Sequence, residues 1–513
     1  MQNNLPNFHR ARQTVVNLGS NFLVLLLNVG VGILLVPFVI RHAGLEAYSF
    51  YPLAINFSQG VILVITAITG TFARFLSVAL HGNDPAVARR IFSTANLALL
   101  VLNLALVPVI LAFSYNVGDL LHVPPELTGE VGLLMAFTLL STLCTITEGG
   151  ISTVAFSLNR IELKNVSQIA SKLILLGGVV ALFLLFGGNL VFIGIAMFAG
   201  AVVSLLISVV FWRHIAPGFV ISLREFDRTF LRQVGASSFW VFVNQIGALI
   251  FLQMDLLFLN LYWGSLVGGA YGAVMQAAIA VRTLFVTVVY VYIPKATFLF
   301  ASEGPKAVAS YILAIERAIA ILSGLVIGIL VGFGPDLLRL WLGPAFVDYT
   351  IPYAVMLIAL APTLVAIPVN SAFAIFNAVR LPAVVTFWTG LLYLALLFGM
   401  RFLETKSPLL VPIAGGLILA VKNGLFTPAY FARVAGMPAR VFFIPYLHFV
   451  LVAAVAGVVG WWVREVLPAP SLIILPLEMG VATVVTAGFV CAALLNADER
   501  GLLARIARRL RRR

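Results

Sequence analysis

Long apolar stretches separated by short polar loops dominate the chain from about residue 14 onward. A helix that crosses a bilayer needs about 20 mainly apolar residues. By this measure the pattern predicts fourteen transmembrane helices, over residues 14–40, 46–73, 91–115, 129–157, 165–187, 189–212, 236–261, 266–293, 307–333, 351–378, 381–403, 408–432, 440–463 and 470–496. Several stretches exceed that length, which indicates helices that tilt or extend beyond the hydrocarbon.

Composition agrees with this interpretation and excludes the soluble classes. Of the 513 residues, 62% are hydrophobic and 10% are charged, whereas soluble domains are about 25% charged. The predicted fold class is therefore an all-α polytopic membrane protein. Cys144 and Cys491 fall within predicted spans, so they indicate neither a disulfide framework nor a metal site.

The basic residues predict the orientation. Cytoplasmic loops are enriched in Lys and Arg, and with a cytoplasmic N-terminus about 23 of them lie on that side against five on the other. Both termini are thus predicted to be cytoplasmic. The net charge of +13 then suits membrane lipids of the anionic inner leaflet rather than nucleic acid. The tail GLLARIARRLRRR is either a topology anchor or a basic amphipathic helix, and the N-terminal span is predicted to be retained rather than cleaved as a signal.

An internal repeat offset by about 220 residues divides the chain. The stretch SNFLVLLLNVGVGILLVPFVIRHAGLEAY aligns with VNQIGALIFLQMDLLFLNLYWGSLVGGAY, which places Asn21 on Asn244. Six helices that recur as six in the same orientation form a parallel repeat, as in secondary transporters. The prediction is an N-lobe with helices 1–6 (residues 1–222), a C-lobe with helices 7–12 (residues 223–435), and helices 13–14 with a basic cytoplasmic tail (residues 436–513).

Four segments carry a resemblance to a known family. They are PFVIRHAGLEAYSFYPLA, TGTFARFLS, the NQIGALIFLQMDLLFLN helix with the following GGAYGAVMQAAIAVRTLFVTVVYVYIPKAT, and FGPDLLRLWLGPAF. They resemble Wzx-type flippases of the MOP superfamily, which also holds MurJ and the MATE exporters. The resemblance implies a V-shaped alternating-access transporter that moves polyprenyl-diphosphate-linked oligosaccharide to the periplasmic leaflet of a bacterial inner membrane. It also implies a role in O-antigen (lipopolysaccharide), exopolysaccharide or capsule synthesis, with glycosyltransferases and a polysaccharide polymerase as partners.

Motifs of soluble enzymes are missing from the sequence. It contains no P-loop, HExxH, GxSxG elbow or Cys/His cluster, so we expect no enzyme activity and no cofactor. Transport would then run on the membrane potential or on a coupling cation, H⁺ or Na⁺. Two alternatives stay open: a MATE-type cation-coupled drug exporter, and a membrane-embedded glycosyltransferase or polymerase.

Ionisable residues inside predicted spans are the candidate functional groups, because a charge within a bilayer needs a partner or water. At 1.5 Å per residue, Glu148 and Lys172 lie at similar depth on neighbouring helices, as do Arg282 and Glu316. The sequence predicts two intramembrane ion pairs from these residues.

Asp255 lies elsewhere, about 15 Å from the depth of Arg282. Trp240, Asn244, Gly247, Phe251 and Asp255 recur at intervals of three and four, which puts them on one stripe of a helix. In the resembling family, helices 1, 2, 7 and 8 line the central cleft. The predicted cavity set from those helices is Arg282, Asp255, Asn244, Asn21, Asn28, Asn56, Gln59 and Gln276. The alternative is that these groups only hold helices together.

A lipid diphosphate needs cationic donors where it enters, and arginine suits phosphate because its planar fork binds two oxygens. Arg74 and Lys295 stand at corresponding ends of helices 2 and 8, with Arg282 deeper. The hypothesis is that Arg74 and Lys295 capture the headgroup at the cytoplasmic mouth and Arg282 receives it. The alternative for Arg74 and Lys295 is ordinary topology anchoring.

Overall fold

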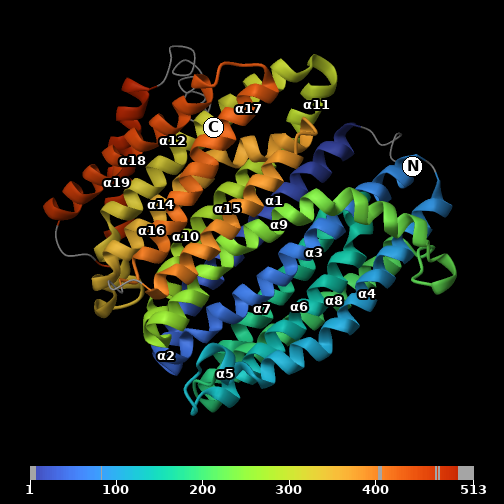
Figure 1. The fold of residues 1–513 in the computed structure, drawn as a ribbon, viewed down its shortest axis with the longest axis horizontal. Coiled ribbons are helices and arrows are strands. Elements are labelled where there is room, and N and C mark those ends of the chain that lie inside the picture. Colours follow the sequence, from blue (N-terminus) through green and yellow to red (C-terminus); the bar gives the residue numbers. More distant parts are fainter. Residues whose placement is uncertain (1–6, 83, 403–406, 468–470, 472–473, 495–513) are drawn as a thin grey trace. The chain divides into compact units, whose positions relative to one another are not determined.

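A computed structural model describes residues 7–82, 84–402, 407–467, 471 and 474–494, and its regular secondary structure over these ranges is entirely helical (Figure 1). The chain divides into two compact units, the first formed by Met1–Ala273 with Arg380–Pro408 and the second by Val274–Val379 with Leu409–Arg513. We describe each unit separately.

The first unit contains most of the N-terminal helices together with one helix from later in the chain. Its elements are α1 (Asn7–Ala43), α2 (Leu45–Tyr48), α3 (Phe50–His81), α4 (Pro85–Tyr115), α5 (Val117–Leu121), α6 (Thr128–Ser157), α7 (Ile161–Phe186), α8 (Leu190–Ile215), the 3₁₀ turn η1 (Leu223–Glu225), α9 (Arg228–Trp263), the start of α10 (Ser265–Tyr290), α15 (Arg380–Gly399) and the 3₁₀ turn η3 (Met400–Phe402).

The second unit holds the remaining helices. They are the rest of α10, α11 (Ile293–Glu303), α12 (Pro305–Gly332), α13 (Gly334–Trp341), the 3₁₀ helix η2 (Pro344–Tyr349), α14 (Thr350–Ile375), α16 (Leu410–Leu419), the π-helical η4 (Ala420–Phe426), α17 (Thr427–Ala435), α18 (Arg440–Val466) and α19 (Ile474–Ala493).

These helices confirm the predicted polytopic membrane fold. Within the described ranges, thirteen helices are long and apolar enough to span a bilayer, and the bent pair Leu45–Leu63 and Ile68–His81 makes up to fourteen. Two helices, α4 and α9, begin earlier than their apolar stretches predict, because the carboxylates of Asp84 and Asp227 cap them. Asp227 accepts hydrogen bonds from the backbone N–H groups of Thr229 and Phe230 at 2.9 and 3.0 Å, which starts α9 at Arg228.

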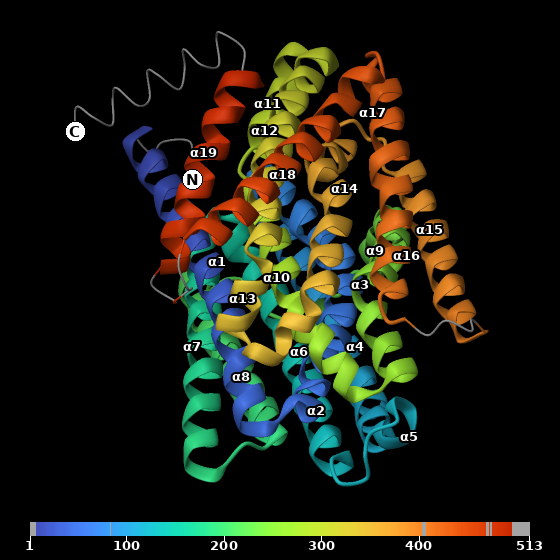
Figure 2. The same ribbon diagram turned by 90° about the vertical axis from the view of Figure 1, so that its left-hand side faces the viewer.

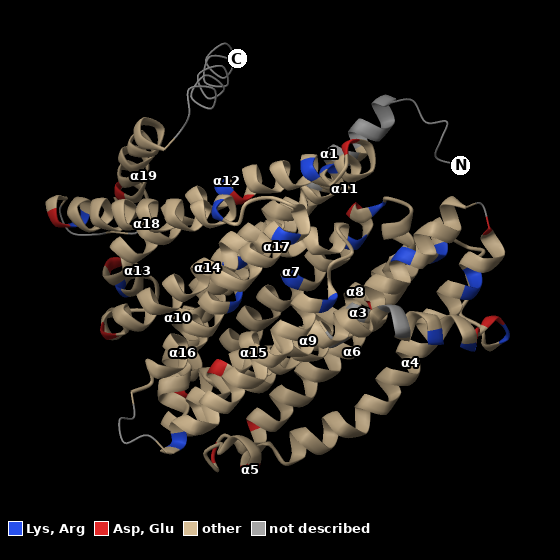
Figure 3. Cartoon of the chain, turned by 45° about the horizontal axis from the view of Figure 1, so that its top comes forward, with Lys and Arg blue, Asp and Glu red and all other residues tan. Residues whose placement is uncertain are grey.

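Figure 3 shows that charged side chains are concentrated at helix ends and loops, while the long helical stretches are almost uncharged. Side chains that face away from the packed interior are large and apolar, as at Leu104, Leu184 and Val484, each more than 60% exposed. An apolar outer surface on helices of this length is what a lipid environment requires.

In the first unit, α6 is the central helix. It packs against α3, α4 and α8, while α7 packs on α8 and α1, and α9 packs on α3 and α15. The predicted lobe limits at residues 222 and 435 concern an ancestral duplication, which packing does not test, so they stay a prediction. Packing alone places α9 and α15 with the N-terminal helices.

In the second unit, α12 and α18 form the most extensive contact between two helices (Figure 2). Gly324, Gly328 and Gly332 recur every four residues on α12, and the space of a Cβ at each is occupied by α18 backbone, such as the Phe449 carbonyl oxygen 2.8 Å from that of Gly324. Small residues at this spacing let membrane helices approach until their backbones touch. Glycine is therefore required along this interface.

Candidate functional site

The carboxylate of Asp255 is held by a tyrosine from the far end of the first unit's sequence. The Tyr393 hydroxyl on α15 donates a hydrogen bond of 2.6 Å to Asp255 Oδ1. The Tyr393 ring also stacks on Phe251, with ring centroids 5.7 Å apart and an interplanar angle of 12°. Tyr393 is fully buried. A hydrogen bond to an ionised group is among the stronger kinds in proteins, so this contact offsets part of the cost of placing Asp255 in a membrane helix.

The predicted stripe on α9 forms one continuous face, and that face lies against α15. The Arg380 guanidinium sits 5.0 Å from the centroid of the Trp240 ring. Farther along α15, the Thr386 carbonyl oxygen would lie 2.5 Å from a Cβ on Gly247. With the Phe251 and Asp255 contacts to Tyr393, four of the five predicted stripe residues therefore meet α15. For these four residues, the contacts therefore agree with the alternative interpretation, in which the stripe holds helices together.

The remaining stripe residue, Asn244, is half-buried. Its neighbour Gln245 reaches α3, where its side-chain amide donates to the Leu63 carbonyl at 3.1 Å and to the Thr66 hydroxyl at 3.2 Å. Polar contacts from α9 therefore extend toward α3 as well as α15.

The candidate residues on α1 and α3 lie in different environments. Asn21 is half-buried and its Oδ1 accepts a hydrogen bond of 2.8 Å from the buried Asn165 amide on α7. Asn28 and Gln59 are exposed. Asn56 is buried, and its Nδ2 donates to no described residue. An unpaired buried donor is unfavourable unless water or a ligand meets it, so Asn56 keeps its place as a candidate.

The predicted ion pair between Glu148 and Lys172 is not formed among the described residues. Glu148 is buried, and its Oε1 accepts hydrogen bonds from the Ser167 and Ser208 hydroxyls, both at 3.2 Å. Equal depth puts two residues at the same height in the membrane, but it does not determine on which side of its helix each one lies. Here the serine side chains, not Lys172, are the ones that face Glu148. Lys172 is half-buried on the same helix as Ser167.

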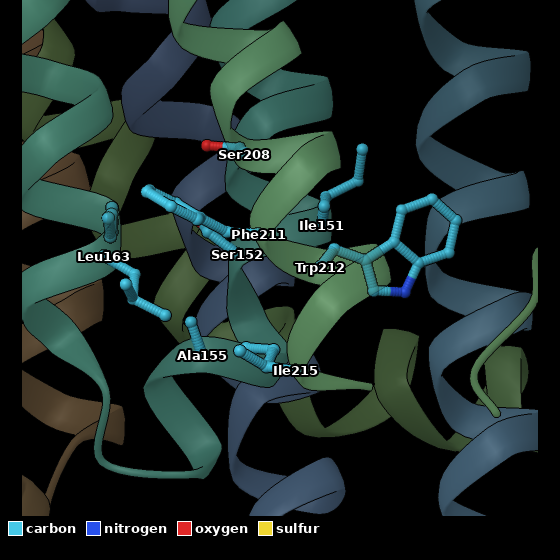
Figure 4. Close-up of a pocket in the computed structure, with 9 residues that line it drawn as sticks. Ile151, Ser152, Ala155, Leu163, Ser208, Phe211, Trp212 and Ile215 are labelled. Atoms are coloured by element: carbon cyan, nitrogen blue, oxygen red, sulfur yellow. The ribbon is translucent and has the colours of Figure 1, made fainter. Parts of the chain in front are cut away.

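Next to these serines, α6, α7 and α8 surround a small hollow of about 10 Å³ (Figure 4). Ser152, Lys164 and Ser208 contribute polar groups, and Trp212 and Phe211 contribute apolar walls. The Trp212 indole N–H is buried and donates to no described residue.

The second predicted ion pair, between Arg282 and Glu316, is likewise not formed among the described residues, although both belong to the second unit. Glu316 is completely buried, and neither carboxylate oxygen accepts a hydrogen bond from a described residue. Arg282 and Gln276 on α10 are half-buried. The two helices were expected to be neighbours because they follow one another in sequence, but α12 has its main contacts with α18 and α14.

The two residues predicted to capture a headgroup are both exposed, but only Lys295 lies at a helix end, in the first turn of α11. The predicted helix-end position of Arg74 is wrong, because α3 continues beyond it to His81. The Arg74 guanidinium lies 5.2 Å from the centroid of the Phe75 ring in the first unit. The Lys295 ammonium lies 4.9 Å from the centroid of the Tyr311 ring in the second unit. Each cation thus rests on an aromatic ring and remains accessible.

Beside Phe75 lies an open hollow of about 230 Å³ between α3, α4 and the start of α9. Its lining is Phe75, Val87, Arg90, Ile91, Asp227, Thr229, Phe230 and Gln233. Two charged side chains line this hollow, Asp227 and Arg90. The Asp227 carboxylate caps α9, whereas Arg90 has no such capping role. Sequence reasoning missed Arg90, because a basic residue in a loop usually reports topology only. It also missed Tyr393, whose contact to Asp255 spans 138 residues.

Comparison with known proteins places this geometry in a fold. No family model matches the chain. The chain is 27% identical over 427 residues, which is 83% of its length and 85% of the relative's, to the uncharacterized membrane protein EpsK of Bacillus subtilis.

Solved structures give a closer view of the architecture. An inward-facing multidrug resistance MATE family transporter of the MOP superfamily aligns over 82% of this chain and 98% of its own, with a TM-score of 0.66 and 13% identity. Lipid II flippase MurJ in an inward closed conformation aligns over 95% of this chain and 100% of its own, with a TM-score of 0.66 and 14% identity. The chain has the MOP-type fold. The predicted resemblance is confirmed at the level of that superfamily's architecture.

Proposed function

We propose that this chain is a secondary transporter that flips a lipid-linked oligosaccharide from the cytoplasmic to the periplasmic leaflet of a bacterial inner membrane during surface polysaccharide synthesis. The observation that carries the proposal is the extent of the fold match. The lipid II flippase aligns over 95% of the chain and the MATE transporter over 82%. The difference is about 67 residues of this chain.

The chemistry of the first unit supports an anionic headgroup. Arg90 lines an open hollow, and Arg74 sits on Phe75 at its edge. Two guanidinium groups near one hollow suit a diphosphate, because each binds two oxygens in one plane. The Phe75 and Phe230 rings that line this hollow provide faces on which a polyprenyl chain or a sugar ring packs.

Further roles follow for the other candidates. In the second unit, Lys295 is accessible at a helix end and is proposed to contact the headgroup as Arg74 does, with Arg282 deeper as the receiving cation. Asn244, Asn56 and Gln276 are proposed to bind sugar hydroxyls, because amide groups donate and accept hydrogen bonds. Asp255 is proposed to act mainly through Tyr393, as a structural link between α9 and α15.

The test is a flipping assay in proteoliposomes with a fluorescent polyprenyl-diphosphate disaccharide, scored by its protection from a membrane-impermeant lectin. The purified chain should speed protection well above the rate of empty vesicles. Arg282→Gln should abolish this rate with normal expression, and Arg90→Gln and Arg74→Gln should raise the substrate concentration that is needed. Arg224→Gln, which removes an exposed charge on η1 that does not line the hollow, is the matched control and should leave the rate unchanged.

Three results would contradict the proposal. A rate equal to that of empty vesicles would remove flipping as the activity. Uptake of an organic cation such as ethidium in place of the lipid would favour the MATE-type exporter. A change in glycan chain length without movement of lipid would favour a polymerase. Adjacent glycosyltransferase and polymerase genes would support the pathway, since these enzymes make and consume the lipid.

A further inference from the structure

The linker between α8 and α9, residues 216–227, carries apolar side chains on both of its sides. Phe219 and Ile221 pack inward, against a buried cluster of the first unit. The exposed apolar side chains of the linker are Val220 at 41%, Leu223 at 80% and Phe226 at 42%. Apolar side chains that are exposed together in this way mark a surface that contacts another molecule or a membrane.

Two buried residues of α4 hold the backbone of the linker, which runs beside this helix (Figure 1). The Ser93 hydroxyl donates to the Ser222 carbonyl and accepts from the Ser222 N–H, both at 2.8 Å. The Thr94 hydroxyl accepts from the Asp227 N–H at 2.9 Å and donates to the Glu225 carbonyl at 3.4 Å. These contacts fix the linker at both ends of η1, so its exposed apolar side chains keep a constant outward direction.

The contact with α4 also sets the depth of the linker in the membrane. α4 begins at Pro85, and its last charged residue is Arg90, after which the helix is uncharged to its end. At 1.5 Å per residue, Ser93 lies about 12 Å along α4 from Pro85. The linker is therefore bound where the charged end of α4 meets its apolar stretch. This is the level of the boundary between lipid headgroups and acyl chains.

The charges in and around the linker suit an anionic lipid surface. Exposed arginines lie in the linker and at the adjoining ends of α8 and α9, at Arg213, Arg224, Arg228 and Arg232. The acidic side chains nearby are engaged, because Asp227 caps α9 and Glu225 lies 4.0 Å from Arg89. Arginine packs its apolar stem along acyl chains while its guanidinium reaches the phosphates, and each basic residue near an anionic leaflet contributes about 1 kcal/mol of binding free energy.

We propose that the linker is a binding surface for anionic phospholipids of the leaflet at this end of the first unit, which is the cytoplasmic leaflet in the predicted orientation. Val220, Leu223 and Phe226 enter the upper acyl region, and the arginines contact lipid phosphates. Binding of this kind grows with the apolar area that is buried and with the attraction to anionic lipid.

The depth of the linker favours lipid over a soluble protein as the partner. A soluble protein reaches this end of the molecule from water, whereas Ser93 and Thr94 hold the linker about 12 Å inside the end of α4. The linker also crosses the predicted lobe limit at residue 222, so lipid binding would fix the start of α9 at the leaflet. The proposal concerns lipids that stay in the membrane. It therefore goes beyond the proposed transport function and does not depend on it.

Site-specific fluorescence in proteoliposomes tests the proposal. The full chain with Cys144→Ser, Cys491→Ser and Leu223→Cys carries one thiol for an NBD label. The vesicles are phosphatidylcholine with or without phosphatidylglycerol, and the quenchers are a lipid with a nitroxide high on its acyl chain and aqueous iodide. The lipid nitroxide should quench the label several-fold more than iodide does. Phosphatidylglycerol should increase that preference, and Arg213→Gln with Arg228→Gln should remove the increase without changing the Tm in detergent.

Ala86→Cys is the matched control, because Ala86 is exposed in the first turn of α4, about 10 Å from Ser93 toward the charged end. Its label should be quenched mainly by iodide in both kinds of vesicle. Equal iodide quenching at Leu223→Cys and Ala86→Cys would overturn the proposal, and so would equal lipid quenching with and without phosphatidylglycerol. A Leu223→Cys label that is open to iodide in these vesicles but shielded in native membranes would assign the linker to a protein partner instead. The assay contains no lipid-linked oligosaccharide, so its failure leaves the proposed function untouched.

Discussion

Two helix interfaces in this protein each contain glycine and an acidic residue, but they differ in whether the acidic residue receives a hydrogen bond. At α9–α15, Gly247 allows close approach and Asp255 receives a hydrogen bond from Tyr393. At α12–α18, a row of glycines allows close approach, and Glu316 receives no hydrogen bond from the described residues. An acidic residue in an apolar helix is thus a structural link where a side chain of the neighbouring helix donates to it, as Tyr393 does to Asp255, whereas the carboxylate of Glu316 accepts from no described residue.

The largest effect is expected for a substitution in the glycine row of α12, which tests the close contact between α12 and α18. Gly328→Ala puts a Cβ against the backbone carbonyl of Ala453, and backbone cannot move aside as a side chain can. We expect a loss of about 1–3 kcal/mol in the free energy of unfolding, typical of overpacking. A lower Tm in detergent, measured by intrinsic fluorescence, checks this.

The control for that substitution is Gly480→Ala on α19, where a Cβ meets nothing within 4 Å. There the same change should stabilise the helix by roughly 0.5–1 kcal/mol, because alanine is the better helix former. Equal effects at the two glycines would mean that α12 and α18 are not in contact as described.

The link between Asp255 and Tyr393 can be broken from the tyrosine side. Tyr393→Phe keeps the ring stacked on Phe251 but removes the donor to the half-buried Asp255 carboxylate. We expect a loss of about 1.5–3 kcal/mol, as for hydrogen bonds to charged groups. Measurement is again by Tm, compared with Asp255→Asn and with the double variant.

In that cycle the double variant should lose less than the sum of the two single variants, because residues in direct contact are coupled. Strict additivity would show that the two groups do not interact. A transport rate that falls with Asp255→Asn but not with Tyr393→Phe would instead return Asp255 to the cavity set.

A smaller effect is expected at Glu148, whose carboxylate accepts hydrogen bonds from two serine hydroxyls. Ser208→Ala removes one of its two hydroxyl donors, and we expect a loss of about 1 kcal/mol. Lys172→Met should change stability by less than this, since Lys172 forms no ion pair with Glu148. The comparison is a pair of Tm measurements. A larger effect at Lys172 than at Ser208 would restore the predicted ion pair.

The smallest expected effect concerns the outer surface of α1. Asn28 is exposed, and a substitution such as Asn28→Ala at a surface position usually changes stability by less than about 0.5 kcal/mol. The Tm should be unchanged. If the flipping rate nevertheless falls, Asn28 contacts the cargo and belongs to the cavity set, whereas Gln59→Ala on α3 serves as an equally exposed comparison.

The sequence by itself determined the number, order and approximate limits of the spans, because crossing a bilayer requires about 20 apolar residues in each helix and the loops are polar. It also placed Asp255, Phe251 and Gly247 on one stripe, since helical periodicity is local.

Only the tertiary structure decided which residue meets which. Tyr393 reaches Asp255 from 138 residues away, and serines occupy the positions around Glu148 where a lysine was predicted. The pattern of apolar residues in a membrane helix constrains depth well but angular position weakly, because lipid and protein neighbours are almost equally apolar. Partners therefore depend on how helices rotate and pack against one another, and that information is spread over the whole chain.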